Sequence, residues 1–154
     1  MYLVLVIQGS SITLFPHNEN KPLTIIATGN TKKAIDKIGY KCTELSRFTK
    51  FKEILNGRVK TLHPKVHASL LYRRNSKQDI SEFNKLNFPN IIYLIVNLYP
   101  FKQIIKSKVD IDNIIEMIDI GGSTMLRAAA KNYKYLTAIP DVNYYKKFIQ
   151  ELNK

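Results

Sequence analysis

A short basic segment, GRVKTLHP (57–64), gathers side chains suited to binding an anionic group. Arg58 can grip a phosphate with parallel N–H groups, and Lys60 adds a compact positive charge. Thr61 supplies a hydroxyl, and the proline that ends the segment suits the first position of a helix. These residues indicate a phosphate-binding loop, and a solvated basic loop is the alternative.

A second polar segment, TGNT (28–31), follows an apolar run directly and precedes a helical pattern. Gly29 can take a positive φ or let a ligand approach the backbone. The hydroxyls of Thr28 and Thr31, with free N–H groups at the start of the helix, would bind a phosphate. An ordinary turn with a helix cap is the alternative reading of this segment.

Asn97 and Tyr99 stand in the segment NLYPF (97–101), at the end of a strongly apolar run. We expect both side chains near the sheet edge where a ligand would lie. Tyr99 can donate a hydrogen bond to an oxygen that gains negative charge during a reaction. The alternative is a tyrosine that packs over the sheet.

The segment DIGGSTMLRAAAKN (119–132) joins an aspartate to a helix that opens at Gly121-Gly122. If folding brings Asp119 close to Lys131, each favours the charged form of the other and they form a coupled acid–base pair. A solvent-facing salt bridge is the alternative, because spacing alone does not exclude it.

His63 and His67 are four residues apart, which is half of a zinc-binding pattern. No acidic residue or cysteine nearby completes such a site, so we expect capping or packing roles and no bound metal. Cys42 is the one cysteine of the sequence. It excludes an internal disulfide framework and is most simply a reduced thiol in a cytoplasmic protein.

Short apolar runs alternate with helical patterns along the chain, which predicts an α/β fold with a parallel sheet. Ligands bind beyond the carboxyl ends of the strands in such sheets, where several of the polar segments follow. We expect strands at 3–7, 23–27, 91–96 and 135–139. We expect helices at 31–38, 64 to about 74, 111–118, 123–132 and 144–152. Residues 8–22 fit no element, and 75–90 read as a polar surface connection.

The 154 residues, 45% of them hydrophobic, predict one globular domain over 1–154 and exclude a disordered or collagen-like chain. No apolar run reaches the roughly 18 residues of a membrane span, so we expect no membrane partner. The net charge is +12, from 24 Lys and Arg against 12 Asp and Glu. The basic residues are scattered and no recognition motif accompanies them, so we expect no nucleic-acid partner.

Three long segments of the sequence resemble the IMP cyclohydrolase domain of the bifunctional purine biosynthesis family. They are GRVKTLHPKVHASLLYRR, IVNLYPF and DIGGSTMLRAAAKN, in this order, and ATGNT and ELSRFTKFKEILNG are also similar to family segments. The resemblance runs from about residue 23 to 152. It implies a methylglyoxal-synthase-like fold, a three-layer sandwich with a central parallel sheet and helices on both faces.

The resemblance also implies the closing step of purine synthesis. In that step 5-formamidoimidazole-4-carboxamide ribotide loses water and closes to inosine monophosphate (IMP), in the cytoplasm. The implied enzyme is a homodimer, and its small-molecule partner is a purine nucleotide. It needs no metal and no organic cofactor.

By resemblance, four residues carry the chemistry. Asp119 and Lys131 are expected to move protons, and Lys60 and Tyr99 to stabilise the formyl oxygen. The ribose phosphate and the base are then expected to contact Thr28, Gly29, Thr31, Arg58, Thr61, Asn97, Gly121 and Gly122.

The sequence departs from the family in three places. The family's Ser-x-Ser-Asp-Lys loop has no clear counterpart in VLVIQGSS (4–11), and Asn30 replaces the family's second loop glycine. The sequence stops at Lys154, before the family's domain tail and transformylase domain. A non-catalytic module that binds a nucleotide or phosphorylated metabolite is therefore the alternative function. A methylglyoxal synthase would be expected to show a different set of acidic catalytic residues.

Overall fold

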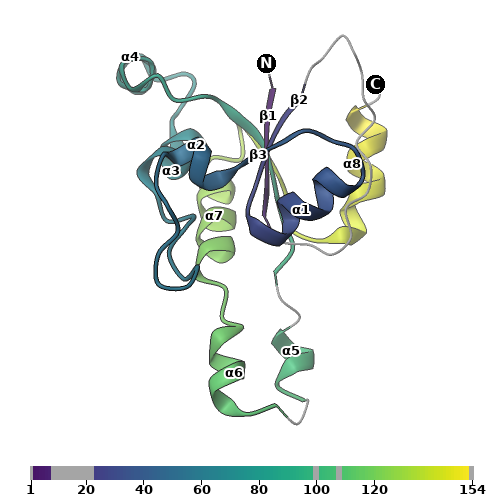
Figure 1. Ribbon diagram of the computed structural model, residues 1–154. Coiled ribbons are helices and arrows are strands. Elements are labelled where there is room, and N and C mark those ends of the chain that lie inside the picture. The colour runs from purple at the N-terminus through teal and green to yellow at the C-terminus, as the bar shows by residue number, and fades with distance from the viewer. Residues whose placement is uncertain (1, 8–22, 99–100, 107–108, 153–154) are drawn as a thin grey trace.

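The computed structural model describes residues 2–7, 23–98, 101–106 and 109–152 of the chain. Within these residues, parallel strands form one five-stranded sheet in the order β3-β2-β1-β4-β5 (Figure 1). The central strand β1 pairs with β2 on one side and β4 on the other. The strands are β1 (Tyr2–Ile7), β2 (Leu23–Ala27), β3 (Cys42–Glu44), β4 (Ile91–Val96) and β5 (Thr137–Ile139).

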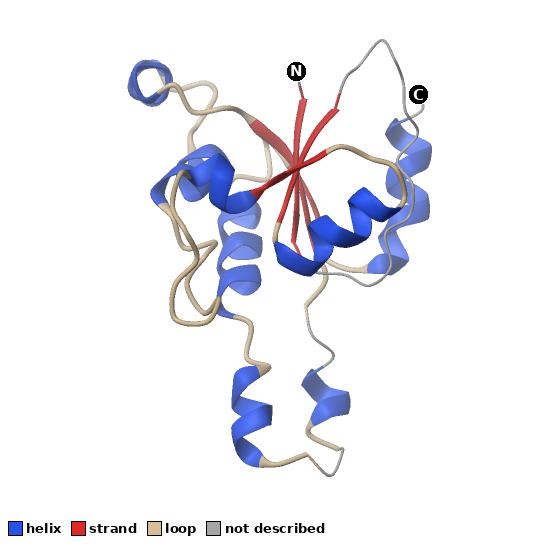
Figure 2. Cartoon of the chain, viewed as in Figure 1, coloured by secondary structure: helices blue, strands red, loops and turns tan. Residues whose placement is uncertain are grey.

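Helices cover both faces of this sheet, with α1 and α8 on one face and α2, α3 and α7 on the other (Figure 2). The helices are α1 (Gly29–Lys37), α2 (Leu45–Thr49), α3 (Pro64–Leu71), α4 (Lys77–Leu86), α5 (Phe101–Ile104), α6 (Ile111–Glu116), α7 (Ile120–Lys131) and α8 (Tyr145–Leu152). A 3-10 turn, η1 (Val142–Tyr144), precedes α8. The predicted three-layer α/β sandwich is confirmed.

Successive side chains along each strand point to opposite faces of the sheet, and this produces two hydrophobic cores. Ile26 and Leu94 point to one face of the sheet and pack with α2, α3 and α7. Ile25 and Ile95, their neighbours in sequence, point to the other face and pack with Ile35 of α1. A strand that is buried on both faces has a continuous apolar sequence, which is why the sequence predicts β2 and β4 as strands.

The predicted strands and helices are present with ends that shift by a few residues. The reading of residues 75–90 as a surface connection is wrong, because they contain α4. Ser76 caps this helix, and its Oγ accepts a hydrogen bond from the N–H of Asp79 at 3.3 Å. The sequence reading also missed α2, α5 and β3, and the unplaced residues 8–22 lie outside the described residues.

The helices α5 and α6 form an arm that projects away from the sheet and its covering helices (Figure 1). Three isoleucines of or next to α6, namely Ile111, Ile115 and Ile118, are 66, 47 and 51% exposed. None of the described helices has the length and apolar character that crossing a membrane requires.

Candidate functional site

A cavity of about 570 Å³ opens beside the carboxyl end of β2. Its walls come from three segments that are far apart in sequence: Thr28, residues 55–61 and residues 115–122. The predicted site residues that line it are Thr28, Arg58, Lys60, Thr61, Asp119, Gly121 and Gly122. The structure therefore gathers most of the predicted phosphate-binding residues and two of the predicted catalytic residues around one space.

A tight loop presents the basic residues to this cavity. Ile54 and Val59 form an antiparallel bridge, and Leu55, Asn56 and Gly57 between them all have positive φ angles of 53°, 54° and 83°. Such a run reverses the chain within a few residues, and glycine adopts a positive φ without steric cost. Lys60 lies beyond the bridge, lines the cavity, and makes no ion pair with any described residue.

Close packing at the start of α7 explains the two adjacent glycines. A Cβ at Gly121 would lie within 3.0 Å of Thr61 Oγ1, and a Cβ at Gly122 within 3.0 Å of Asp119 Oδ2. Any larger residue would therefore displace a neighbour that lines the cavity. The backbone of α7 can approach the basic loop only because Gly121 has no side chain, and Asp119 can fold over the start of α7 only because Gly122 has none.

Asp119 is the N-cap of α7, and its Oδ1 accepts a hydrogen bond from the Gly122 N–H at 2.6 Å. Its Oδ2 is buried and has no hydrogen-bond partner. A buried acceptor without a donor is unusual in a native protein and marks a position that a ligand can complete. One carboxylate thus combines a structural contact with an unused oxygen at the cavity.

The arginine of the basic loop is already paired. Arg58 donates through Nε to Glu116 Oε2 at 3.3 Å and through Nη2 to Glu116 Oε1. Glu116 is the last residue of α6 and also lines the cavity, so the pair joins the arm to the basic loop. Sequence reasoning missed Glu116, because no spacing rule links residues 58 positions apart.

The start of α1 differs from the prediction for TGNT. Gly29 has the expected positive φ of 32°, but its N–H faces Glu44 Oε1 at 3.4 Å. Glu44 ends β3, and its other carboxylate oxygen accepts a hydrogen bond from Ser46 at 3.0 Å. Thr31 is buried within α1, and neither it nor Gly29 lines the cavity. The first amide of α1, which belongs to the predicted phosphate loop, therefore faces a carboxylate.

The structure does not bring Lys131 to Asp119 within one chain. The two residues bound the same helix, with Asp119 as its N-cap and Lys131 at its last position. A rise of 1.5 Å per residue separates their backbones by roughly 18 Å. The acid–base pair that their possible proximity suggested does not form inside one copy of the chain.

Asn97 also does not line the cavity. Asn97 follows β4 and donates from Nδ2 to the Tyr145 hydroxyl of α8 at 2.6 Å, while its Oδ1 is buried without a partner. Burial of the Tyr145 hydroxyl raises its pKa, and the hydrogen bond from Asn97 opposes that shift. Tyr99 lies outside the described residues.

The two histidines spaced four residues apart, His63 and His67, have capping and packing roles. His63 is the N-cap of α3, and its Nδ1 accepts from the Lys65 N–H at 3.1 Å. His67 is half-buried, and burial lowers its pKa. Among the residues that the structure describes, no three His, Cys, Asp or Glu side chains are placed to hold a metal ion.

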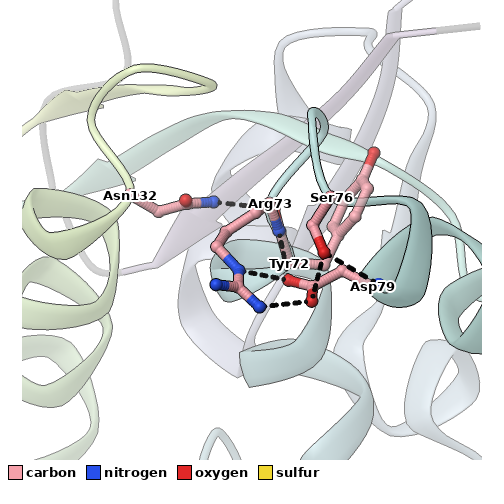
Figure 3. A network of polar contacts seen from close by, with 5 residues as sticks. All are labelled: Tyr72, Arg73, Ser76, Asp79 and Asn132. Atoms are coloured by element: carbon pink, nitrogen blue, oxygen red, sulfur yellow. Dashed lines mark hydrogen bonds and ion pairs between the residues drawn. The ribbon is translucent and has the colours of Figure 1, made fainter.

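A polar network fixes the far end of α7 (Figure 3). Asn132, next to Lys131, donates from Nδ2 to the carbonyls of Leu70 at 2.8 Å and Tyr72 at 3.0 Å. Arg73 donates to Asp79 through Nε and Nη2 at 2.9 and 2.7 Å, and this guanidinium holds the pKa of Asp79 well below its usual range. The network joins the ends of α3 and α7 to the start of α4, and so places Lys131.

Comparisons with known proteins agree with this geometry. The family model described as MGS-like domain matches residues 12–124. The bifunctional purine biosynthesis protein PurH of Ruminiclostridium cellulolyticum is 48% identical over 136 residues, which cover 88% of this chain and 26% of that protein. PurH of Acetivibrio thermocellus is 49% identical over 129 residues, 83% of this chain and 25% of that protein.

PurH of Fusobacterium nucleatum is 42% identical over 135 residues, which cover 88% of this chain and 27% of that protein. The chain thus spans about a quarter of the length of these curated relatives. The crystal structure of ForH superposes with a TM-score of 0.77 at 25% identity, over 99% of this chain and 78% of that one.

Proposed function

The chain belongs to the MGS-like domain family, and on that premise we propose that it is an IMP cyclohydrolase. The proposed reaction closes 5-formamidoimidazole-4-carboxamide ribotide to IMP. Its relatives among the curated proteins are purine biosynthesis proteins. The observation that carries the proposal is the cavity that places Lys60 and the unpartnered Oδ2 of Asp119 beside the candidate phosphate-binding residues.

The chemistry needs a proton acceptor and a stabiliser of negative charge. The carboxamide nitrogen attacks the formyl carbon, a C–N bond forms, and the formyl oxygen gains negative charge. Asp119 is suited to take the proton that the nitrogen loses and to return it to the oxygen, which the Lys60 ammonium stabilises. The formamido N–H supplies the second proton, its nitrogen forms a double bond to the former formyl carbon as the C–O bond breaks, and the oxygen leaves as water. Both reacting groups belong to one substrate, so orientation supplies much of the catalysis and no cofactor is required.

Binding of the substrate is assigned to the remaining cavity residues. The ribose phosphate is proposed to contact Arg58 together with the hydroxyls of Thr28 and Thr61. The backbone of Gly121 and Gly122 is proposed to contact the base, where the absence of side chains leaves room for it. Tyr99 keeps its proposed role at the formyl oxygen, whereas Asn97 donates to Tyr145, does not line the cavity, and is given no contact with the base. We place the reaction in the cytoplasm, where a phosphorylated substrate is retained.

The position of Lys131 leads us to propose that the active form is a homodimer. Because α7 separates Lys131 from Asp119, only a second copy can bring a Lys131 to the same substrate. The exposed isoleucines of the arm offer apolar surface for such an association. We propose no nucleic-acid partner and no membrane partner for this homodimer.

The first experiment separates the charge of Asp119 from its capping role. Asparagine caps a helix about as well as aspartate, so Asp119→Asn keeps α7 in place while it removes the proton acceptor. Formation of IMP from the formylated substrate is measured by absorbance, and we expect the rate to fall by about a hundredfold or more. Glu82→Gln, an exposed change of the same charge on α4, is the matched control and should keep the wild-type rate.

A wild-type rate in Asp119→Asn would contradict the mechanism. A second arm of the experiment mixes Asp119→Asn chains with Lys131→Ala chains. If the two residues act from different copies, the mixture should recover part of the activity that each variant lacks alone. Full activity of Lys131→Ala alone would exclude the role of Lys131. If Lys131→Ala is inactive and the mixture recovers no activity, the two residues do not act from different copies.

A non-catalytic nucleotide-binding module is the second candidate, favoured by one observation. The Gly29 N–H of the predicted phosphate loop already faces Glu44, so the site departs from an open phosphate cradle. Binding of IMP without any ring closure by the purified wild-type chain would support this alternative over the enzyme.

A further inference from the structure

The carboxylate that holds Arg58 occupies the edge of the guanidinium that an anionic ligand would use. Nε and Nη2 of Arg58 both donate to the two oxygens of Glu116. This side-on arrangement is the geometry in which arginine grips a phosphate or carboxylate with two N–H groups. One acceptor group can use that edge at a time.

Carboxylates face other anion-binding features in the same way. The Gly122 N–H at the start of α7 donates to Asp119, and the Gly29 N–H at the start of α1 faces Glu44. Lys60 is the cation of the cavity wall that makes no ion pair with the described residues. Among the described residues that line the cavity, two carboxylates, Glu116 and Asp119, stand beside two cations, Arg58 and Lys60, and an entering phosphate meets all four.

Exposure makes the Arg58–Glu116 pair the contact that can exchange. The two side chains are 62 and 55% exposed, so water reaches both and the pair is readily broken. By contrast, Asp119 Oδ2 is buried. An arriving phosphate can thus replace Glu116 at Arg58 without disturbing the cap of α7.

We propose that Glu116 competes with the phosphate of the ligand for Arg58 and so sets how tightly the cavity holds a phosphorylated ligand. The proposal rests on the proposed function only in that the ligand carries a phosphate. Glu116 lowers the affinity for any single anion, so a ligand must add contacts elsewhere in the cavity to bind well. Because Glu116 ends α6, its release from Arg58 also frees the arm from the basic loop.

The test measures equilibrium binding of inorganic phosphate and of IMP by calorimetry. It compares the wild-type chain with Glu116→Gln, Arg58→Gln, the double variant, and the control Glu82→Gln. Removal of the carboxylate that competes for Arg58 should tighten binding of both probes about three- to tenfold, because the exposed ion pair no longer has to be broken. Arg58→Gln should weaken binding, and the double variant should match Arg58→Gln, because the competition acts only through Arg58.

Unchanged or weaker binding in Glu116→Gln would overturn the proposal, since a carboxylate that merely positions Arg58 gives that result. Tightening that persists in the double variant would overturn it too, because the effect would then be a general field effect. Failure of both wild type and Glu116→Gln to bind either probe likewise counts against it. The ring-closure assay is separate: tightening in Glu116→Gln without IMP formation by wild type defeats the proposed function alone.

Discussion

Gly121 is a point of close approach in the cavity wall, and its substitution tests that packing directly. In Gly121→Ala the new Cβ would overlap Thr61 Oγ1, and Thr61 is only 4% exposed, so the side chain has little room to move. We expect a loss of about 1–3 kcal/mol in the free energy of unfolding, measured with urea.

The control for this prediction shrinks the neighbour instead. In the Thr61→Ala background the clash partner is absent, so Gly121→Ala should be nearly neutral there or slightly stabilising, since alanine favours a helix. Equal destabilisation in both backgrounds would show that the backbone of Gly121, and not its contact with Thr61, resists the substitution.

His67 gives the protein a dependence on pH that can be assigned to one residue. Burial lowers its pKa from the ordinary 6.5, and its Nε2 has no hydrogen-bond partner. The unfolded chain therefore binds the proton more readily than the folded one, so stability is lost as the pH falls through 6.5 toward the lower folded value. Urea unfolding at pH 7.5 and 5.5 should show a smaller drop for His67→Gln than for wild type. Equal drops would refute the assignment.

Site residues could be predicted from the sequence where several suitable side chains stand close together in one segment. Arg58, Lys60 and Thr61 share one loop, and the structure places all three at the cavity. Glu44 and Glu116 were not predictable, because each acts on a group that is distant in sequence. A carboxylate on a surface helix looks alike in sequence whether it meets solvent or an arginine.

At the scale of elements, α7 depends on an anchor at its far end. In Asn132→Ala the carbonyls of Leu70 and Tyr72 lose their shared donor, and Asn132 is only 7% exposed. We expect a loss of about 1–3 kcal/mol in the free energy of unfolding, because buried acceptors would be left unpaired. If Lys131 acts in catalysis, the rate of IMP formation should fall as well.

Asn132→Asp is the informative comparison, since it keeps the size of the side chain but cannot donate to a carbonyl. Both variants should be destabilised relative to wild type in urea unfolding. Wild-type stability in either one would show that the end of α7 is held by packing alone.

The helix α4 shows why polarity misled the sequence reading of residues 75–90. Only Phe83 of this helix is buried, where its ring stacks on Tyr72 with 3.9 Å between centroids. Ile80, Phe83 and Leu86 follow one another at spacings of three, but Ile80 and Leu86 are exposed and most of the other residues are polar, which obscured the helical pattern. The cap at Ser76 was a further signal, but a capping residue alone is weak evidence for a helix.

For the whole molecule, the α/β class and the parallel sheet followed from strands buried on both faces. The order of the strands did not follow, because β1 is first in the chain yet central in the sheet. That position depends on how the connections cross the two faces, which local patterns do not encode. The two cores, in contrast, are already implied by adjacent apolar residues such as Ile25 and Ile26.

The two outermost strands, β3 and β5, are only three residues long each. A neighbouring molecule that tried to extend the sheet would find very few free backbone groups to pair with, and β3 follows directly after Lys41. Short, charged borders of this kind discourage sheet-to-sheet aggregation.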